Sequence, residues 1–259
     1  MKQLNEQFTD PGYVPEEYTV PYDVIELPSQ GLLYPNKKNT VKVEYLTALD
    51  ENILSAPNLI RSGKAMDILI ERKVKDLGFP SEDLLDGDRM AILLFLRTTA
   101  FGEKYSQLVA NKDGKVVEGE IDLTKLKQNK LTINPDKNGE FDYILPQSGK
   151  NVKFRFLTGK DEQIIKEENE RLKERSKSED DFLITLRLEK MITEIDGNRD
   201  KIHHRNIIKN LGIIDVRKLI KYVNDAEPGI DFETTAGIQG GESVTTFLTI
   251  TTSFFWPEL

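Results

Sequence analysis

The chain has 259 residues, 38% hydrophobic and 31% charged, so it can bury a core but carries many charged side chains relative to that core. Its 44 acidic and 36 basic residues give a formal net charge of −8, which opposes binding to nucleic acid or to an anionic membrane, because both need a basic surface. It has no cysteine, which excludes disulfides and thiolate chemistry and favours a reducing compartment. We also expect no signal peptide and no membrane span, and therefore a soluble, unexported protein.

Residues 1–22 are predicted to form an extended N-terminal arm. Pro11, Pro15 and Pro21 fix the backbone angle φ and remove hydrogen-bond donors, and no helical spacing of apolar residues is present. Such an arm either covers its own domain or becomes ordered on a neighbouring protein. The arm's candidate partner-binding residues are aromatic: Phe8, Tyr13 and Tyr18.

Residues 23–103 are predicted to be a strand hairpin followed by a helical region. The sequence around 24–27 and 41–46 is strand-like, and residues 89–97 are apolar nearly all round, which is typical of a buried central helix. We interpret Asp86-Gly87-Asp88 as an aspartate cap of this helix. A calcium loop is the alternative, but its remaining ligand positions are missing.

Residues 104–158 are predicted to be a small β-ribbon module, because two strand-like runs flank an Asp-Gly turn. Residues 159–229 are predicted to be helical. The helices expected there cover 161–175, 182–195, 203–210 and 215–225, the last one capped by Asp215. Residues 230–259 are predicted to be a C-terminal β-ribbon that packs on 104–158. The expected fold class is therefore α+β, a helical core with an inserted small antiparallel β module that the C-terminal strands complete.

The sequence contains no motif for phosphate-loop, dinucleotide, serine-hydrolase or zinc-protease chemistry. The two histidines, His203 and His204, are adjacent and would diverge by about 100° on a helix, so we interpret them as a solvent-facing helix start instead of a metal site. The acidic cluster at 179–181 is interpreted in the same way, as a helix N-terminus. We therefore expect no enzymatic activity, no catalytic residues and no cofactor.

Several stretches occur in a shared order along residues 24–257. They are Leu27–Pro35, Leu46–Leu54, Asp88–Arg97 followed by Phe101–Tyr105, Phe154–Glu162, Ile195–Gly197 and Phe254–Pro257. In this order they resemble the baseplate hub assembly family of T-even-type contractile-tailed bacteriophages.

The resemblance implies a non-enzymatic structural or assembly protein of the tail baseplate, in the hub or the wedge. Such a protein is located in the virion, is assembled in the host cytoplasm, and contacts other tail proteins within a symmetric hetero-oligomeric assembly. One alternative is a transient assembly chaperone that is absent from the mature virion. A second is a nucleic-acid-binding adaptor derived from a zinc ribbon, for which the basic stretch Lys125–Lys130 is short.

Relatives in that family often carry two Cys-x-x-Cys-Gly zinc knuckles. The matching positions here are Ala110, Asp113, Ala236 and Gln239. Because all four thiolates are absent, the resemblance implies a degenerate zinc-ribbon-like pair without metal. It also implies that the two ribbons lie side by side, with Ala110 near Ala236. The C-terminal aromatic residues would cover them, either as intramolecular core or as partner-binding residues: Phe254, Phe255 and Trp256.

Overall fold

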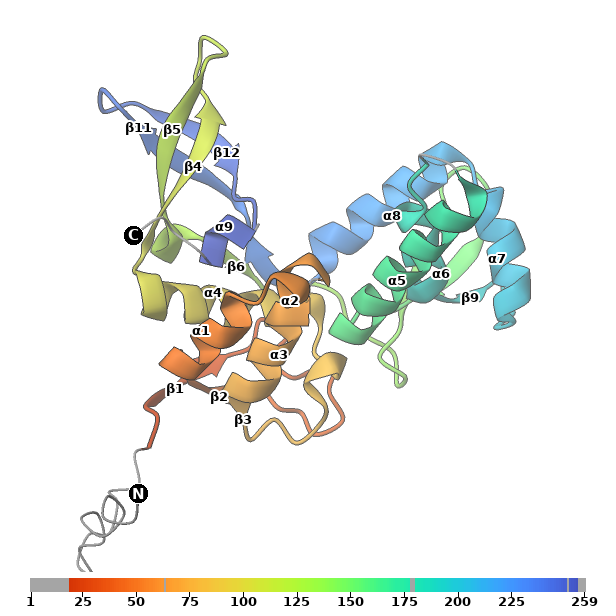
Figure 1. The fold of residues 1–259 in the computed structure, drawn as a ribbon. Helices are drawn as coiled ribbons and strands as arrows, with labels where there is room; N and C mark the ends of the chain where they lie inside the picture. Colours follow the sequence, from red (N-terminus) through yellow and green to blue (C-terminus); the bar gives the residue numbers. More distant parts are fainter. Residues whose placement is uncertain (1–18, 63, 178–179, 251, 256–259) are drawn as a thin grey trace, which may run out of the picture.

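The structure is a computed structural model that describes residues 19–62, 64–177, 180–250 and 252–255. It is a mixed α+β protein in which helices are combined with several small antiparallel sheets. Figure 1 shows the N-terminal helices at the centre, a four-stranded sheet on one side and a second helical lobe on the other. In the part of the chain that the structure describes, no helix is both long and apolar enough to cross a membrane.

The N-terminal part is built on a three-stranded antiparallel sheet and the helices that follow it. Its elements are β1 (Tyr22–Glu26), β2 (Thr40–Glu44), α1 (Ala48–Leu54), α2 (Pro57–Ser62), α3 (Lys64–Lys73), β3 (Val74–Lys75), the 3-10 turn η1 (Ser81–Asp83) and α4 (Asp86–Phe101). The predicted central helix is confirmed as α4, which buries Ile92, Leu93 and Leu96 and ends at Gly102. Gly102 adopts a φ of +87°, which favours glycine and stops the helix.

The projecting sheet combines strands from two distant parts of the chain. Its strands are β4 (Lys104–Ala110), β5 (Val116–Asp122), β11 (Glu233–Ile238) and β12 (Ser243–Phe247), in the order β12-β11-β5-β4. After the 3-10 turn η2 (Leu123–Lys125), a short ladder of β6 (Lys127–Asn129) with β10 (Gly229–Asp231) leads away from the sheet. The central pairing of β5 with β11 is antiparallel and joins residues more than one hundred positions apart.

The second lobe packs helices on another three-stranded sheet. Its elements are β7 (Phe141–Ile144), β8 (Asn151–Phe154), α5 (Gly159–Ser176), α6 (Leu183–Met191), β9 (Ile192–Ile195), α7 (Lys201–Lys209) and α8 (Ile213–Ala226). The strands of the predicted 104–158 module are thus divided, since β4 and β5 pair with β11 whereas β7 and β8 pair with β9.

Two local predictions in this lobe are wrong. The predicted helix 182–195 ends at Met191, because the β-branched Ile192 and Ile195 are buried in β9 against β8. Asp215 does not cap α8, whose N-cap is Gly212. Its carboxylate instead accepts hydrogen bonds from the backbone N of Gln147 (2.6 Å) and Ser148 (3.0 Å), so it fixes the turn between β7 and β8.

Candidate functional site

The degenerate knuckle positions lie at different points along the strands of the four-stranded sheet. Ala110 pairs with Val116 at the exposed end of the β4–β5 hairpin, whereas Ala236 pairs with Ile121, five residues further along β5. The prediction that Ala110 lies near Ala236 is therefore wrong. Ala236 is instead a core residue over Gly119, where an added Cβ would lie only 2.9 Å from that of Ala236. Asp113 and Gln239 lie in the two hairpin turns, and no group of acidic residues or histidines among the described residues is arranged to hold a metal.

The C-terminal aromatic residues that the structure describes belong to the chain's own core. Phe254 and Phe255, on the short helix α9 (Thr252–Phe255), are fully buried, and the Phe254 ring packs edge-on against Tyr105 with centroids 5.1 Å apart. The buried Arg97 of α4 donates from Nε to the carbonyl O of Phe254 at 2.6 Å. This geometry favours intramolecular packing for both residues. The other aromatic candidates lie outside the described residues: Phe8, Tyr13, Tyr18 and Trp256.

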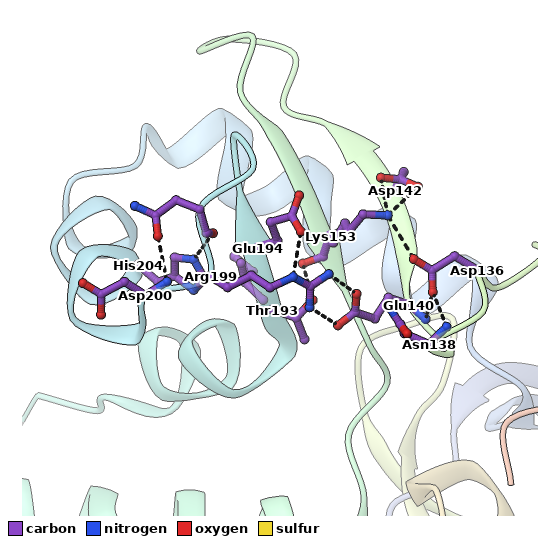
Figure 2. A network of polar contacts seen from close by, with 12 residues as sticks. Asp136, Asn138, Glu140, Asp142, Lys153, Thr193, Glu194, Arg199, Asp200 and His204 are labelled. Carbon is purple, nitrogen blue, oxygen red and sulfur yellow. Dashed lines mark hydrogen bonds and ion pairs between the residues drawn. The ribbon is translucent and has the colours of Figure 1, made fainter. Parts of the chain in front are cut away.

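The second lobe carries the polar network of Figure 2. Arg199 reaches between Glu140 and Glu194, with a bidentate pair to Glu140 at 2.7 and 3.0 Å, and Lys153 bridges Asp136 and Asp142. Arg199 is exposed and Lys153 is half-buried, and their pairs with Glu140 and Asp136 hold the loop before β7 against β8 and the segment after β9.

The prediction that both histidines face solvent is wrong for one of them. His203 is exposed, but His204 is buried, with Nε2 2.7 Å from the carbonyl O of Asn198. Its Nδ1 has no hydrogen-bond partner among the described residues. His204 lines a groove of about 680 Å³ between α5, α6 and α7, whose edge carries the basic residues Lys190, Lys201 and Lys209. This groove concentrates positive charge in an acidic chain.

A buried carboxyl group joins α4 to the turn after β1. Asp88 accepts hydrogen bonds from the backbone N (2.8 Å) and Oγ (2.6 Å) of Ser29 and from the Tyr34 hydroxyl (2.5 Å). Burial raises the pKa of Asp88, and these hydrogen bonds oppose that rise. The predicted aspartate cap is wrong, because the N-cap of α4 is Leu85, while Asp86 and Asp88 lie in the first turn of the helix.

The first turn of α4 also lies unusually close to the chain that follows α8. A Cβ added at Gly87 would lie 2.8 Å from the Cα of Gly229 and from the carbonyl carbon of Pro228, and nearer still to the Pro228 carbonyl oxygen. Only glycine leaves room for this backbone contact. It brings together the residues just before each of these positions, Asp86 and Glu227.

Asp86 and Glu227 face a cavity of about 300 Å³ that we call the acidic cavity. Its lining residues come mainly from the start of α4, the start of α5, α6 and the end of α8. Glu162 of α5 contributes a third carboxyl group, and Arg187 of α6 pairs with it at 2.6 Å. The wall includes apolar side chains of α6 and α8: Ile184, Leu188, Ile220 and Val223.

The three carboxyl groups of the acidic cavity are held where charge is unfavourable. Burial and, after it, the charge of Asp86 raise the pKa of Glu227 to about 8, against the opposing effect of Arg187. Burial also raises the pKa of Asp86 and of Glu162. Glu227 is the C-cap of α8, where the partial negative charge of the helix end disfavours an anion, whereas Asp86 and Glu162 lie at favourable N-terminal turns.

No family model matches this chain, and no curated protein or solved structure matches it either. Carboxyl groups with raised pKa in a partly apolar cavity can bind a cation or transfer a proton. The sequence analysis interpreted Asp86 as a helix cap and missed the other three charged residues of the acidic cavity: Glu162, Arg187 and Glu227. The sequence holds one signal for two of these residues. Asp86 precedes Gly87 and Glu227 precedes Pro228-Gly229, the two points where the backbones meet.

Proposed function

We propose that this chain is a non-enzymatic structural or assembly protein of a contractile phage tail baseplate. The observation that carries the proposal is the ordered series of stretches that resemble the baseplate hub assembly family. Several of these stretches make long-range joints within the fold. Ser29 and Tyr34 of the first stretch bond to Asp88 of the third, and Phe254 of the last is bonded by Arg97. Hydrogen bonds between such distant stretches support a role that depends on a fixed shape.

We further infer that the four-stranded sheet derives from a zinc-ribbon-like pair. Its support is the survival of both turn glycines at the degenerate knuckles, since Gly114 and Gly240 have φ of +75° and +100°. These are conformations that few residues other than glycine adopt. The packing of Ala236 over Gly119 would then replace the stabilisation that a metal supplies in relatives.

Exposed apolar side chains on the projecting sheet support a role in protein contacts. Leu108 on β4 and Val116 on β5 are 74% and 69% exposed, and both strands extend away from the helical body (Figure 1). Phe247 on the opposite edge strand β12 is 62% exposed. Large apolar residues on sheet edges are suited to partner strands or partner surfaces.

Quantitative mass spectrometry of purified virions tests the proposal. A fixed copy number per tail supports a structural component, and its loss after deletion of the gene should accompany incomplete baseplates. Presence in infected cells with absence from virions would instead identify a transient assembly chaperone. Normal, infectious tails without the protein would contradict both roles.

A further inference from the structure

We propose that the acidic cavity receives a lysine or arginine side chain from a partner protein. The inference rests on the proposed function only in assuming that the chain works by binding proteins. Its physical basis is the position of three carboxyl groups, Asp86, Glu162 and Glu227, against a single guanidinium, Arg187. A cation on an aliphatic stem would neutralise the excess of carboxyl groups and would cover the apolar wall.

Asp86 and Glu227 differ from the buried acids of the fold in their side-chain partners. Buried Asp50 pairs with Lys73 at 2.5 Å, and buried Asp161 pairs with Arg155 at 2.7 Å. Among the described residues, by contrast, no side-chain hydrogen bond or ion pair is formed by Asp86 or Glu227, which are half-buried in the wall of the acidic cavity. Both carboxyl groups are therefore available to a ligand that enters the cavity, where partial burial strengthens its electrostatic attraction.

The shape and lining of the acidic cavity point to the same kind of ligand. Its apolar side is formed by α6 and α8, and Ile184 at this side is 55% exposed. A ligand that combines a charged end with an apolar stem fits such a site. The exposed Ile184 gives the flanking residues of a protein partner an apolar surface, which a small free amine would not use.

A bound metal ion fits the acidic cavity less well. No group of three or more metal-binding side chains in the described part of the chain is arranged to hold an ion. An ammonium or guanidinium group tolerates wider spacing, because it donates several hydrogen bonds in different directions.

Binding of a cation should be coupled to proton release from Glu227. The charged or titratable groups around it are Asp86 and Asp88 of α4, Glu162 of α5 and Arg187 of α6. With a pKa of about 8, Glu227 is about one-tenth ionised at pH 7 and about nine-tenths ionised at pH 9. Only the ionised form attracts the ligand fully, so apparent affinity should rise about tenfold between these pH values.

The test uses the full chain, NMR detection of the Ile184 and Ile220 methyl groups, and matched peptides. The probe is acetyl-Ala-Leu-Lys-Leu-Ala-amide, and the control peptide carries acetyl-lysine at the central position. We expect saturable shifts with the lysine peptide alone, and about tenfold weaker binding at pH 9 for Glu227→Gln. The matched variant Glu233→Gln, at an exposed acid on β11, should bind as the wild type does.

The contrary outcomes are equally specific. Equal binding of the two peptides, or unchanged binding by both Glu227→Gln and Asp86→Asn, would overturn the cation site. Tighter binding of 1,4-diaminobutane than of the lysine peptide would overturn the assignment to a protein side chain. The virion measurement is independent of these titrations, because absence from virions would remove the baseplate role and leave the cation site intact.

Discussion

Replacement of Gly87 by alanine tests the backbone contact that assembles the acidic cavity. In the first turn of an ordinary helix this change stabilises by up to about 1 kcal/mol, because alanine has the higher helix propensity. Here the new Cβ would lie 2.8 Å from the Gly229 Cα, whereas carbon atoms in contact are separated by about 3.5–4.0 Å. The two segments must therefore move apart by at least about 1 Å, since the Pro228 carbonyl oxygen is nearer still, and neither can relieve the contact by rotating a side chain.

Overpacking of this kind costs about 1–3 kcal/mol, and a clash between two backbones belongs at the upper end. After the gain in propensity, we expect the free energy of unfolding to fall by about 2 kcal/mol and the Tm by about 4–8 °C. Urea titration followed by circular dichroism measures the first quantity, and calorimetry the second. The matched control is Gly237→Ala on β11, where an added Cβ would meet only the Glu120 carbonyl oxygen at 3.9 Å. A Gly87→Ala variant as stable as the wild type would refute the close contact.

Three further predictions concern buried polar groups. Tyr34→Phe should lower the free energy of unfolding by about 1–3 kcal/mol in urea titrations, because Asp88 and the backbone N of Leu85 both lose a partner. The control Tyr143→Phe should change it little, because the Tyr143 hydroxyl makes no hydrogen bond within the described part of the chain. Arg97→Met should lower the free energy of unfolding by about 2–4 kcal/mol, since three backbone carbonyl groups lose their donor. Chymotrypsin should then cut the C-terminus before it cuts the rest of the chain. A C-terminus that stays intact would contradict this. Folded Glu227 holds its proton up to about pH 8 whereas the unfolded chain releases it near 4.5, so the wild type loses stability as pH rises between these values. The free energy of unfolding of Glu227→Gln should therefore equal that of the wild type near pH 5 and exceed it by about 2 kcal/mol at pH 9. This amount is reduced because the carboxyl group is partly exposed. The same difference at every pH would contradict the raised pKa of Glu227.

Elements with strong local signals could be predicted from the sequence. The central helix follows from the continuous apolar run 89–97, and the β4–β5 hairpin follows from its Asp-Gly turn, because both signals act over a few residues. The helices α5, α7 and α8 were also predicted close to their observed limits. Ile192–Ile195 was misassigned to the preceding helix, because its apolar residues continue the helical spacing of α6. Only the pairing of these residues with β8 makes them a strand.

The candidate site could not be predicted in this way, because it depends on contacts between distant segments. Asp86 has the position of a plausible helix cap, and Glu227 that of an ordinary charged residue after a helix. Their relation appears only when Gly87 meets Pro228 and Gly229 across the fold. His204 illustrates the same limit, since its burial depends on the packing of α7 against α6 and β9.

The close contact at Gly87 and the chemistry of the acidic cavity are energetically linked. The contact fixes Asp86 beside Glu227, so part of the packing energy of α4 against the end of α8 is opposed by the cost of desolvating both carboxyl groups. A bound lysine or arginine would remove that opposition and would stabilise the folded chain in proportion to its occupancy. The contribution of Glu227 to the free energy of unfolding should thus fall as pH rises toward about 8, where its carboxyl group becomes ionised and unpaired. A cationic partner would offset this loss most at alkaline pH. A protein that binds here would therefore strengthen the contact between α4 and the chain that follows α8.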